Sequence, residues 1–259
     1  MVVRWQTERD AAAQAARQAG RVLLEWSDKF TIQRKGVGDF VTEADHAAQE
    51  SIRKRIARQF PDDDFVGEEG SAPGKNGAAR RWIVDPLDGT FNYTHGFSFY
   101  CVSIALEVEG VLVAGAIYDP VRQECFSAGA GGGADCNGAP IHVSSIDVME
   151  DALLCAGFPI NEYAPATRAF IESTRRSWSV RRLGSAALAL AYVAAGRAEC
   201  FWAHKIQAWD VAAGALLVAE AGGVVTHLDG ARYGTAKGEI LGTNGLVHQQ
   251  VQAALAETM

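Results

Sequence analysis

Apolar residues recur at helical spacing near the start of the chain. In residues 7–27, Ala11, Ala15, Ala19 and Leu23 fall on one face, which predicts an amphipathic helix. Local sequence predicts further helices over residues 42–59, 164–176, 184–195, 209–221 and 246–256.

Short runs rich in β-branched and aromatic residues alternate with these helices and predict strands. The predicted strands cover residues 30–33, 82–84, 100–109, 111–118, 124–128, 153–157, 180–183, 199–203, 224–227 and 239–242. Glu109 and Gly110 join two of them as a hairpin. Because hairpins are mixed with strand–helix alternation, a purely parallel doubly wound sheet is not expected.

Three helix starts carry capping signals. Thr7 with Asp10, and Thr42 with Asp45, have the spacing of a capping box. Ser185 is the predicted N-cap of the helix over residues 184–195. The capping role is by itself a complete structural explanation for the aspartate at position 45.

The remaining segments predict turns and loops. Residues 34–39 hold two glycines and predict a flexible turn, and residues 61–64 predict a solvated acidic turn. Residues 71–80 predict a surface loop. The Gly-rich residues 129–138 lack the GxxxxGK[ST] pattern, so a tight turn is favoured over a phosphate-binding loop.

Composition limits the classes of function. The length of 259 residues and 48% hydrophobic content predict one α/β domain over residues 1–259, with lobes at 1–150 and 151–259 as an alternative. The net charge of −7 argues against a nucleic-acid surface. Neither a signal peptide nor a membrane span is predicted. The five cysteines lack CxxC spacing, which predicts reduced thiols and a cytoplasmic location.

The candidate chemistry centres on two aspartates after the buried strand at residues 82–84. Pro86 is expected to end that strand, because proline cannot donate to a sheet ladder. Asp85 and Asp88 then lie about one turn apart, ahead of Gly89 and Thr90, whose backbone amides can face an anion. Carboxylates that hold Mg²⁺ would attract a phosphate, although an ordinary Asp-Pro turn also explains the motif.

Two more acidic motifs change that balance. GEEG at residues 67–70, WIVDPLDGTFNYTHG at 82–96 and AWDVAAG at 208–214 occur in the order and spacing of a known family. With these blocks, the chain resembles the inositol monophosphatase family of Mg²⁺-dependent phosphatases over essentially its whole length. The resemblance implies an α/β fold with αβαβα layers, in which mixed sheets lie between pairs of helices. It also implies inhibition by Li⁺ and a homodimer.

The resemblance also implies a metal site for two or three Mg²⁺ ions. One ion would be held by Glu68, Asp85 and the carbonyl of Leu87, and a second by Asp85, Asp88 and Asp210. Four acids gathered without cations would be costly, because like charges at short range force some of them to protonate.

Catalytic and substrate-binding roles follow from the same resemblance. Glu68 and Thr90 would orient and deprotonate a metal-bound water, and Asp45 would support Thr90. The substrate-binding residues that the resemblance implies are Asp88, Gly89, Thr90, Gly184, Ala186, Ala203 and Asp210.

One departure from the family pattern concerns the substrate. Ala203 stands where many members carry a glutamate that contacts an inositol hydroxyl, so selectivity for inositol phosphate is in question. His204 and Lys205 lie near the substrate end by alignment, and a role in specificity is left open for both. For His95, a bystander role is favoured.

The predicted function is a Mg²⁺-dependent phosphomonoesterase for a small polyol or sugar phosphate, with inositol monophosphate as the default substrate. Histidinol phosphate is the main alternative, followed by fructose bisphosphate and a nucleotide 3′-phosphate. A different class is a partner-binding protein with a vestigial site. The complete set of metal ligands argues against that class.

Overall fold

The computed structural model describes residues 4–36, 39–72, 74, 79–158 and 164–258. Within these ranges the chain forms seven α-helices and one short 3₁₀ helix, η1 (Met149–Asp151). The α-helices are α1 (Gln6–Trp26), α2 (Glu43–Gln59), α3 (Thr90–Thr94), α4 (Ala164–Arg176), α5 (Ala186–Ala194), α6 (Ala208–Glu220) and α7 (His248–Ala256).

The strands form two large sheets and one small antiparallel pair. The pair is β1 (Ile32–Gly36) with β2 (Asp39–Thr42). The eight-stranded sheet has, in spatial order, β10 (Ala139–Pro140), β9 (Ala134–Cys136), β8 (Glu124–Gly129), β7 (Val111–Asp119), β6 (Cys101–Val108), β5 (Arg80–Asp88), β3 (Asp64–Gly67) and β4 (Gly70–Ala72). The five-stranded sheet has the order β12 (Ser179–Arg181), β11 (Leu153–Gly157), β13 (Cys200–His204), β15 (Glu239–Thr243) and β14 (Val224–Thr226).

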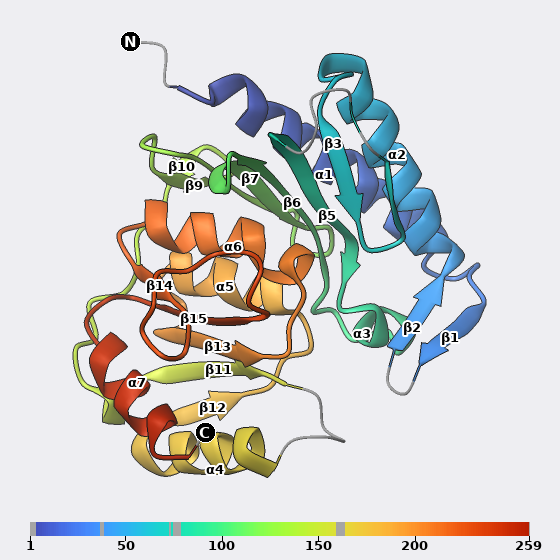
Figure 1. Cartoon of the computed structure of the whole chain (residues 1–259). Coiled ribbons are helices and arrows are strands. Elements are labelled where there is room, and N and C mark those ends of the chain that lie inside the picture. Colours follow the sequence, from blue (N-terminus) through green and yellow to red (C-terminus); the bar gives the residue numbers. More distant parts are fainter. Residues whose placement is uncertain (1–3, 37–38, 73, 75–78, 159–163, 259) are drawn as a thin grey trace.

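Helices and sheets stack in alternating layers (Figure 1). Helices α1 and α2 cover one face of the eight-stranded sheet, and α5 with α6 separate this sheet from the five-stranded one. Helices α4 and α7 lie on the far side of the second sheet. Both large sheets contain parallel and antiparallel pairs. The predicted αβαβα fold class is therefore confirmed, whereas the single domain over residues 1–259 stays a prediction.

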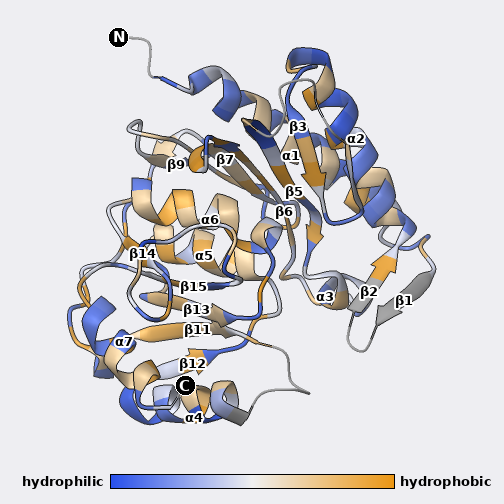
Figure 2. Ribbon diagram, viewed as in Figure 1, coloured by the Kyte–Doolittle hydropathy of each residue, from blue (hydrophilic) through white to orange (hydrophobic). Residues whose placement is uncertain are grey.

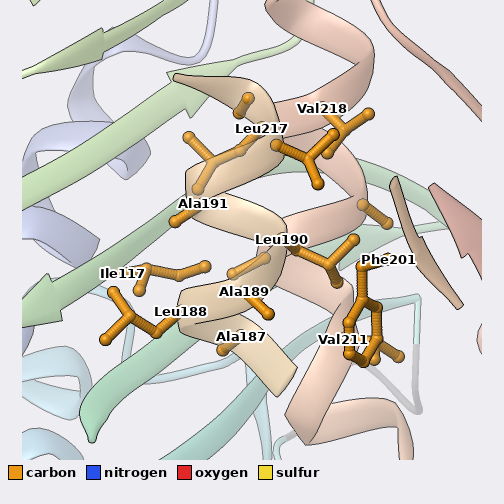
Figure 3. Close-up of a cluster of buried hydrophobic side chains, with 14 of the residues drawn as sticks. Ile117, Ala187, Leu188, Ala189, Leu190, Ala191, Phe201, Val211, Leu217 and Val218 are labelled. Carbon is orange, nitrogen blue, oxygen red and sulfur yellow. The ribbon is translucent and has the colours of Figure 1, made fainter. Parts of the chain in front are cut away.

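Position in the stack explains the composition of each helix (Figure 2). Helix α1 buries the predicted alanine face together with Leu23, and its other side is polar. Helices α5 and α6 lie between two sheets, so they are apolar almost all round. In Figure 3, Leu190 of α5 and Val218 of α6 lie in one buried cluster with Phe201 of β13. This cluster joins the two sheets through the central helices.

The strand before the central motif runs further than predicted. Strand β5 continues through Pro86 to Asp88, so the expectation that Pro86 ends it is wrong. Its pairing with β6 is irregular between Asp85 and Asp88, and the latter lies opposite Cys101. Proline cannot donate a ladder hydrogen bond, so the strand continues through an irregularity of the bulge type rather than a turn.

The capping predictions had mixed outcomes. The capping box of Thr42 and Asp45 is present at the start of α2, and Ser185 accepts from the backbone N–H of Leu188 as the N-cap of α5. The capping box of Thr7 and Asp10 is wrong. Helix α1 begins one residue earlier, at Gln6, and has no side-chain cap.

Two loop predictions also need correction. The stretch 34–39 contributes to β1 and β2 rather than to a turn alone, and its Val37 and Gly38 lie outside the described residues. The acidic turn at 61–64 is not simply solvated. The carboxylate of Asp63 is 6% exposed and accepts from Arg80 Nε at 2.8 Å and Trp82 Nε1 at 3.0 Å.

The Gly-rich turn holds a carboxylate of the protein itself. The backbone amides of Gly131 and Gly133 donate to the two carboxylate oxygens of Glu220, each at 2.9 Å. The amides of these two glycines are therefore engaged in an internal contact, which agrees with the prediction of a tight turn.

All five cysteines lie in the described residues and are free thiols, as predicted. Among the described helices, none combines the length and the apolar character that crossing a bilayer requires.

Candidate active site

Three carboxylates meet where β5 ends and α6 begins. Asp85 and Asp88 come from β5, and Asp210 comes from the first turn of α6. Each offers an oxygen, and these oxygens all lie within 4.8 Å of one another. Asp85 and Asp88 are only 1% and 8% exposed, so little water can separate their charges.

The electrostatics of this cluster are unfavourable without a cation. Burial, followed by the charges of Glu68, Asp88 and Asp210, raises the pKa of Asp85 well above its ordinary value. Burial also raises the pKa of Asp88 to about 6 and the pKa of Asp210 well above its usual range. Oxygen ligands that converge and repel each other are the donor set that a hard divalent cation stabilises. The residues present therefore fit the Mg²⁺ that the family implies.

One oxygen of Asp88 is anchored by the start of α5. Asp88 Oδ2 accepts from the Ser185 hydroxyl at 2.6 Å and from the Ala187 backbone N–H at 2.7 Å. The buried thiol of Cys101 lies 3.9 Å from the same oxygen. These contacts use Oδ2 and orient the whole carboxylate. The sequence predicts only a helix-capping role for Ser185, so its contact with Asp88 is an additional finding.

Glu68 lies close to this cluster but outside the tightest group. Its backbone N–H donates to the Val84 carbonyl at 3.1 Å, which places it directly beside β5. Its charge contributes to the raised pKa values of Asp85 and Asp210. The adjacent Glu69 was not predicted to matter, yet its side chain is only 3% exposed, and its charge helps to raise the pKa of Asp45.

Asp45 and Thr90 are hydrogen-bonded, as their predicted roles require. Asp45 Oδ2 is held by the backbone N–H and the hydroxyl of Thr42, at 2.8 and 2.7 Å. Its other oxygen, Oδ1, lies 3.2 Å from the Thr90 hydroxyl, which is also 3.0 Å from the Leu87 carbonyl. A hydroxyl has one proton, so Thr90 donates to one of these acceptors at a time. The capping box thus also orients Asp45 toward Thr90.

Gly89 allows the chain to turn between β5 and α3. Its φ of +97° is rarely adopted by residues with a Cβ, and a Cβ there would lie 3.0 Å from the Phe99 carbonyl oxygen. Asn92 then joins this turn to the second half of the chain. Its Nδ2 donates to the carbonyls of Phe99 and Leu183, at 2.7 and 2.8 Å.

A cavity of about 240 Å³ opens beside the carboxylates. Its lining includes four of the predicted substrate-binding residues, namely Asp88, Gly184, Ala186 and Asp210. Gly89, Thr90 and Ala203 are not among the described residues that line it. Most of the remaining wall comes from β11, from the segment before α5 and from the segment after β13.

The structure places Ala203 behind this wall. It is fully buried in β13, where it is paired with Gly157 on one side and Ile240 on the other. A Cβ on Gly157, which does line the cavity, would lie 3.5 Å from the Ala203 Cβ. Ala203 is therefore adjacent to the cavity without contributing to its surface, and its predicted role in substrate binding stays a prediction.

His95 has different surroundings from His204 and Lys205. His95 Nδ1 lies 2.8 Å from the carbonyl of Phe91, and its ring packs against the Phe91 ring at 4.2 Å with a tilt of 31°. His95 is not among the described residues that line the cavity, which agrees with a bystander role. His204 and Lys205 both line the cavity.

Comparison with known proteins decides the family. Residues 5–259 match the inositol monophosphatase family. The chain belongs to the inositol monophosphatase family. It is 39% identical over 258 residues to the inositol-1-monophosphatase of Synechocystis sp., an alignment that covers 98% of this chain and 90% of that protein. It is 40% identical over 246 residues to the Pseudomonas aeruginosa protein named Nus factor SuhB, covering 90% of each.

Solved structures agree with this family membership. The crystal structure of the extragenic suppressor protein suhB from Bartonella henselae superposes with a TM-score of 0.94 at 37% identity, covering 98% of this chain and 100% of that one. The resemblance inferred from the three acidic motifs is thus confirmed. As a member of the inositol monophosphatase family, the chain is a phosphoric monoester hydrolase.

Several wall residues of this inositol monophosphatase-family site escaped prediction. Phe158 and Arg182 line the cavity, and so does Ile206. None belongs to a recognisable motif, because wall residues of a cavity need only the right shape and polarity. The one signal in the sequence was their proximity to strand ends at residues 157, 183 and 203.

Proposed function

We propose that this chain is a Mg²⁺-dependent phosphomonoesterase for a small polyol or sugar phosphate, with inositol monophosphate as the default substrate. The observation that carries the proposal is the buried convergence of Asp85, Asp88 and Asp210 beside a cavity of about 240 Å³. Family membership supports the same chemistry.

The proposed metal ligands are the carboxylates of Glu68, Asp85, Asp88 and Asp210, with the carbonyl of Leu87. Two or three Mg²⁺ ions would be held there, and when bound they would supply positive charge for the phosphate oxygens and lower the pKa of water. The hydrogen bond from the Ser185 hydroxyl at 2.6 Å would fix the orientation of the Asp88 carboxylate in this ligand set.

Thr90, supported by Asp45, is proposed to orient the attacking water. When the Thr90 hydroxyl donates to Asp45, its lone pairs face outward and can accept a hydrogen bond from water. Glu68 would orient the same water and accept its proton. The water oxygen then bonds to phosphorus, the ester P–O bond breaks in line, and the departing alcohol oxygen takes up a proton.

Substrate binding is proposed to use both sides of the cavity entrance. The backbone amides of Gly89 and Thr90 would hold the phosphate. The leaving alcohol would extend along Gly184 and Ala186, which line the cavity. Ala203 would act only through the neighbouring wall, because it is buried behind Gly157.

A partner-binding role is the second candidate, because the Pseudomonas relative is named Nus factor SuhB. The intact acidic cluster favours catalysis over a vestigial site. Histidinol phosphate, fructose bisphosphate and nucleotide 3′-phosphates remain alternative substrates. The proposal further includes a cytoplasmic homodimer that binds neither nucleic acid nor membrane. The free thiols of all five cysteines support the reducing location.

The test is release of inorganic phosphate from a panel of inositol, histidinol, fructose and nucleotide phosphates. We expect turnover with Mg²⁺, loss of turnover with excess chelator, and inhibition by Li⁺. Light scattering at micromolar concentration is expected to give a dimer. Robust turnover in chelator would exclude the metal-dependent mechanism, whereas no turnover on any ester would favour the partner-binding role.

A further inference from the structure

The lining of the cavity beside the carboxylates carries side chains of opposite charge. Asp88 and Asp210 are its acidic side chains and are called the acidic end below. Arg182, His204 and Lys205 contribute to the rest of its lining, and the described lining residues include no third carboxylate. A substrate whose phosphate lies beside these two acids would therefore share the cavity with basic side chains.

Arg182 is the best-defined of these basic groups. Its guanidinium donates to the Phe158 carbonyl at 2.7 Å and lies 5.2 Å from the centroid of the Phe158 ring. The Phe158 ring is in turn stacked on the buried Trp202 ring, with centroids 5.7 Å apart. Within the described residues, no carboxylate forms an ion pair with Arg182, and its positive charge is not neutralised by the protein there.

Lys205 adds a second charge at a conformational cost. Its φ is +55°, in the left-handed region that favours glycine, although a lysine occupies the position. Backbone strain of this kind persists where the surrounding structure or a function requires the residue. Lys205 immediately follows β13 and lines the cavity, so a glycine there would remove the strain together with the charge.

One acid next to this wall, Glu239, contacts two basic side chains. His204 Nδ1 lies 3.7 Å from Glu239, whose other oxygen is 2.8 Å from Lys237 Nζ. Glu239 is thus shared between two basic side chains. The cavity lining itself carries Arg182 and Lys205.

From this arrangement we propose that the preferred substrate is a phosphomonoester whose leaving alcohol carries a second anionic group, bound by Arg182 and Lys205. The inference rests on the proposed phosphatase function and narrows its substrate class. Inositol monophosphate, which has no such group, would be hydrolysed less efficiently. An ester with an ammonium group, such as histidinol phosphate, would be disfavoured by the like charges.

The experiment compares kcat/KM for esters that differ in one charged group. Glycerol 3-phosphate is neutral at its far end, 3-phosphoglycerate carries a carboxylate, and serinol phosphate carries an ammonium group. Fructose 6-phosphate and fructose 1,6-bisphosphate form a second pair, which distinguishes a second phosphate from a carboxylate. At low ionic strength, we expect kcat/KM for 3-phosphoglycerate or for fructose 1,6-bisphosphate to be about tenfold higher than for the matching ester without the second anionic group. This advantage should fall as salt is added.

Variants assign the preference to the proposed residues. Arg182→Gln is expected to lower the ratio of charged to neutral kcat/KM about five- to tenfold, mainly through KM, and Arg182→Lys to retain part of it. Lys205→Gln should lower the same ratio by a smaller factor. Arg181→Gln is the matched control, because this adjacent arginine makes the same charge change without lining the cavity.

Three outcomes would overturn the inference. Hydrolysis of the neutral esters with no advantage for either anionic partner would exclude the second-anion class and leave the phosphatase function intact. A preference that Arg182→Gln and Arg181→Gln reduce equally would reflect overall charge instead of this site. Failure to hydrolyse any ester would overturn the phosphatase proposal along with it. The salt dependence of the native protein tests the inference even if a variant does not fold.

Discussion

The acidic and the basic side chains that line the cavity beside the carboxylates are held in different ways. At the acidic end, Asp88 is buried on the same strand as its neighbour Asp85, and each carboxylate accepts a hydrogen bond from the protein. At the basic end, Arg182 and Lys205 lie in separate connecting segments and are exposed. The acidic end is compact and internally organised, whereas the basic end consists of side chains on a wall.

This difference separates reaction chemistry from substrate choice. Carboxylates that hold a cation must be positioned closely, so their supporting contacts leave little room for variation. A wall that receives the leaving alcohol needs only suitable shape and charge, and its residues can change without loss of the reaction. Variants at the acidic end should therefore affect turnover, and those at the basic end should affect the ranking of substrates.

The largest effect is expected from Asp88→Asn, which removes a charged group from the acidic end. We expect kcat to fall on the order of a hundredfold or more for every ester in the panel, because the loss concerns a ligand common to all substrates. Asp151→Asn, in the exposed η1 turn, is the control for the same chemical change. A loss confined to one substrate would break the proposed division between the two ends.

Ser185→Ala tests the support beneath the acidic end. Removing the hydroxyl that donates to Asp88 at 2.6 Å should weaken Mg²⁺ binding by about ten- to a hundredfold, as measured by titration calorimetry on metal-free protein. Ser185→Thr keeps a hydroxyl and should restore much of the affinity. The cap of α5 is also lost in Ser185→Ala, so thermal unfolding must be measured alongside. Unchanged Mg²⁺ affinity in a folded variant would show that Ser185 serves only the helix.

Ala203→Glu tests how far the wall can be reshaped. A carboxylate there could accept hydroxyl hydrogen bonds from a polyol, each charge-assisted bond contributing about 1.5–3 kcal/mol. The kcat/KM ratio of inositol phosphate to histidinol phosphate would then rise on the order of tenfold to a hundredfold. The gain would shrink if His204 or Lys205 pairs with the new acid. Because Ala203 is buried behind Gly157, an unchanged ratio would mean that position 203 cannot reach the substrate.

The smallest effect is expected from Lys205→Gly. Glycine adopts a positive φ without strain, so relief of the left-handed conformation should outweigh its larger unfolded-state entropy by up to about 1 kcal/mol. For a chain of this size that corresponds to a rise in Tm of about 2–4 °C. Gln123→Gly is the matched control, since Gln123 has a φ of +56° away from the cavity. Both variants should gain stability, and only Lys205→Gly should lower the preference for anionic esters. A change in that preference with Gln123→Gly would contradict the assignment.

The sequence alone determined the family, the layered fold class and the acidic motifs. These features are local: Asp85 and Asp88 are three residues apart, and the Thr42–Asp45 capping box needs only one helical turn. Hydrophobic periodicity likewise predicted the helices, because burial of one face depends on spacing along the chain. Its errors fell at boundaries. The strand through Pro86 extends beyond its predicted end, since pairing with β6 continues on both sides of the irregularity.

Only the tertiary structure decided what surrounds those motifs. Ser185 contacts Asp88 from 97 residues away, a contact that no local pattern encodes. Arg182 and Lys205 reach one cavity because β11, β13 and α5 pack together there. Ala203 is fully buried in β13 between Gly157 and Ile240, whereas the next residue, His204, lines the cavity. Residue spacing specifies the reacting groups of this protein, whereas the packing of distant elements specifies which substrate can lie beside them.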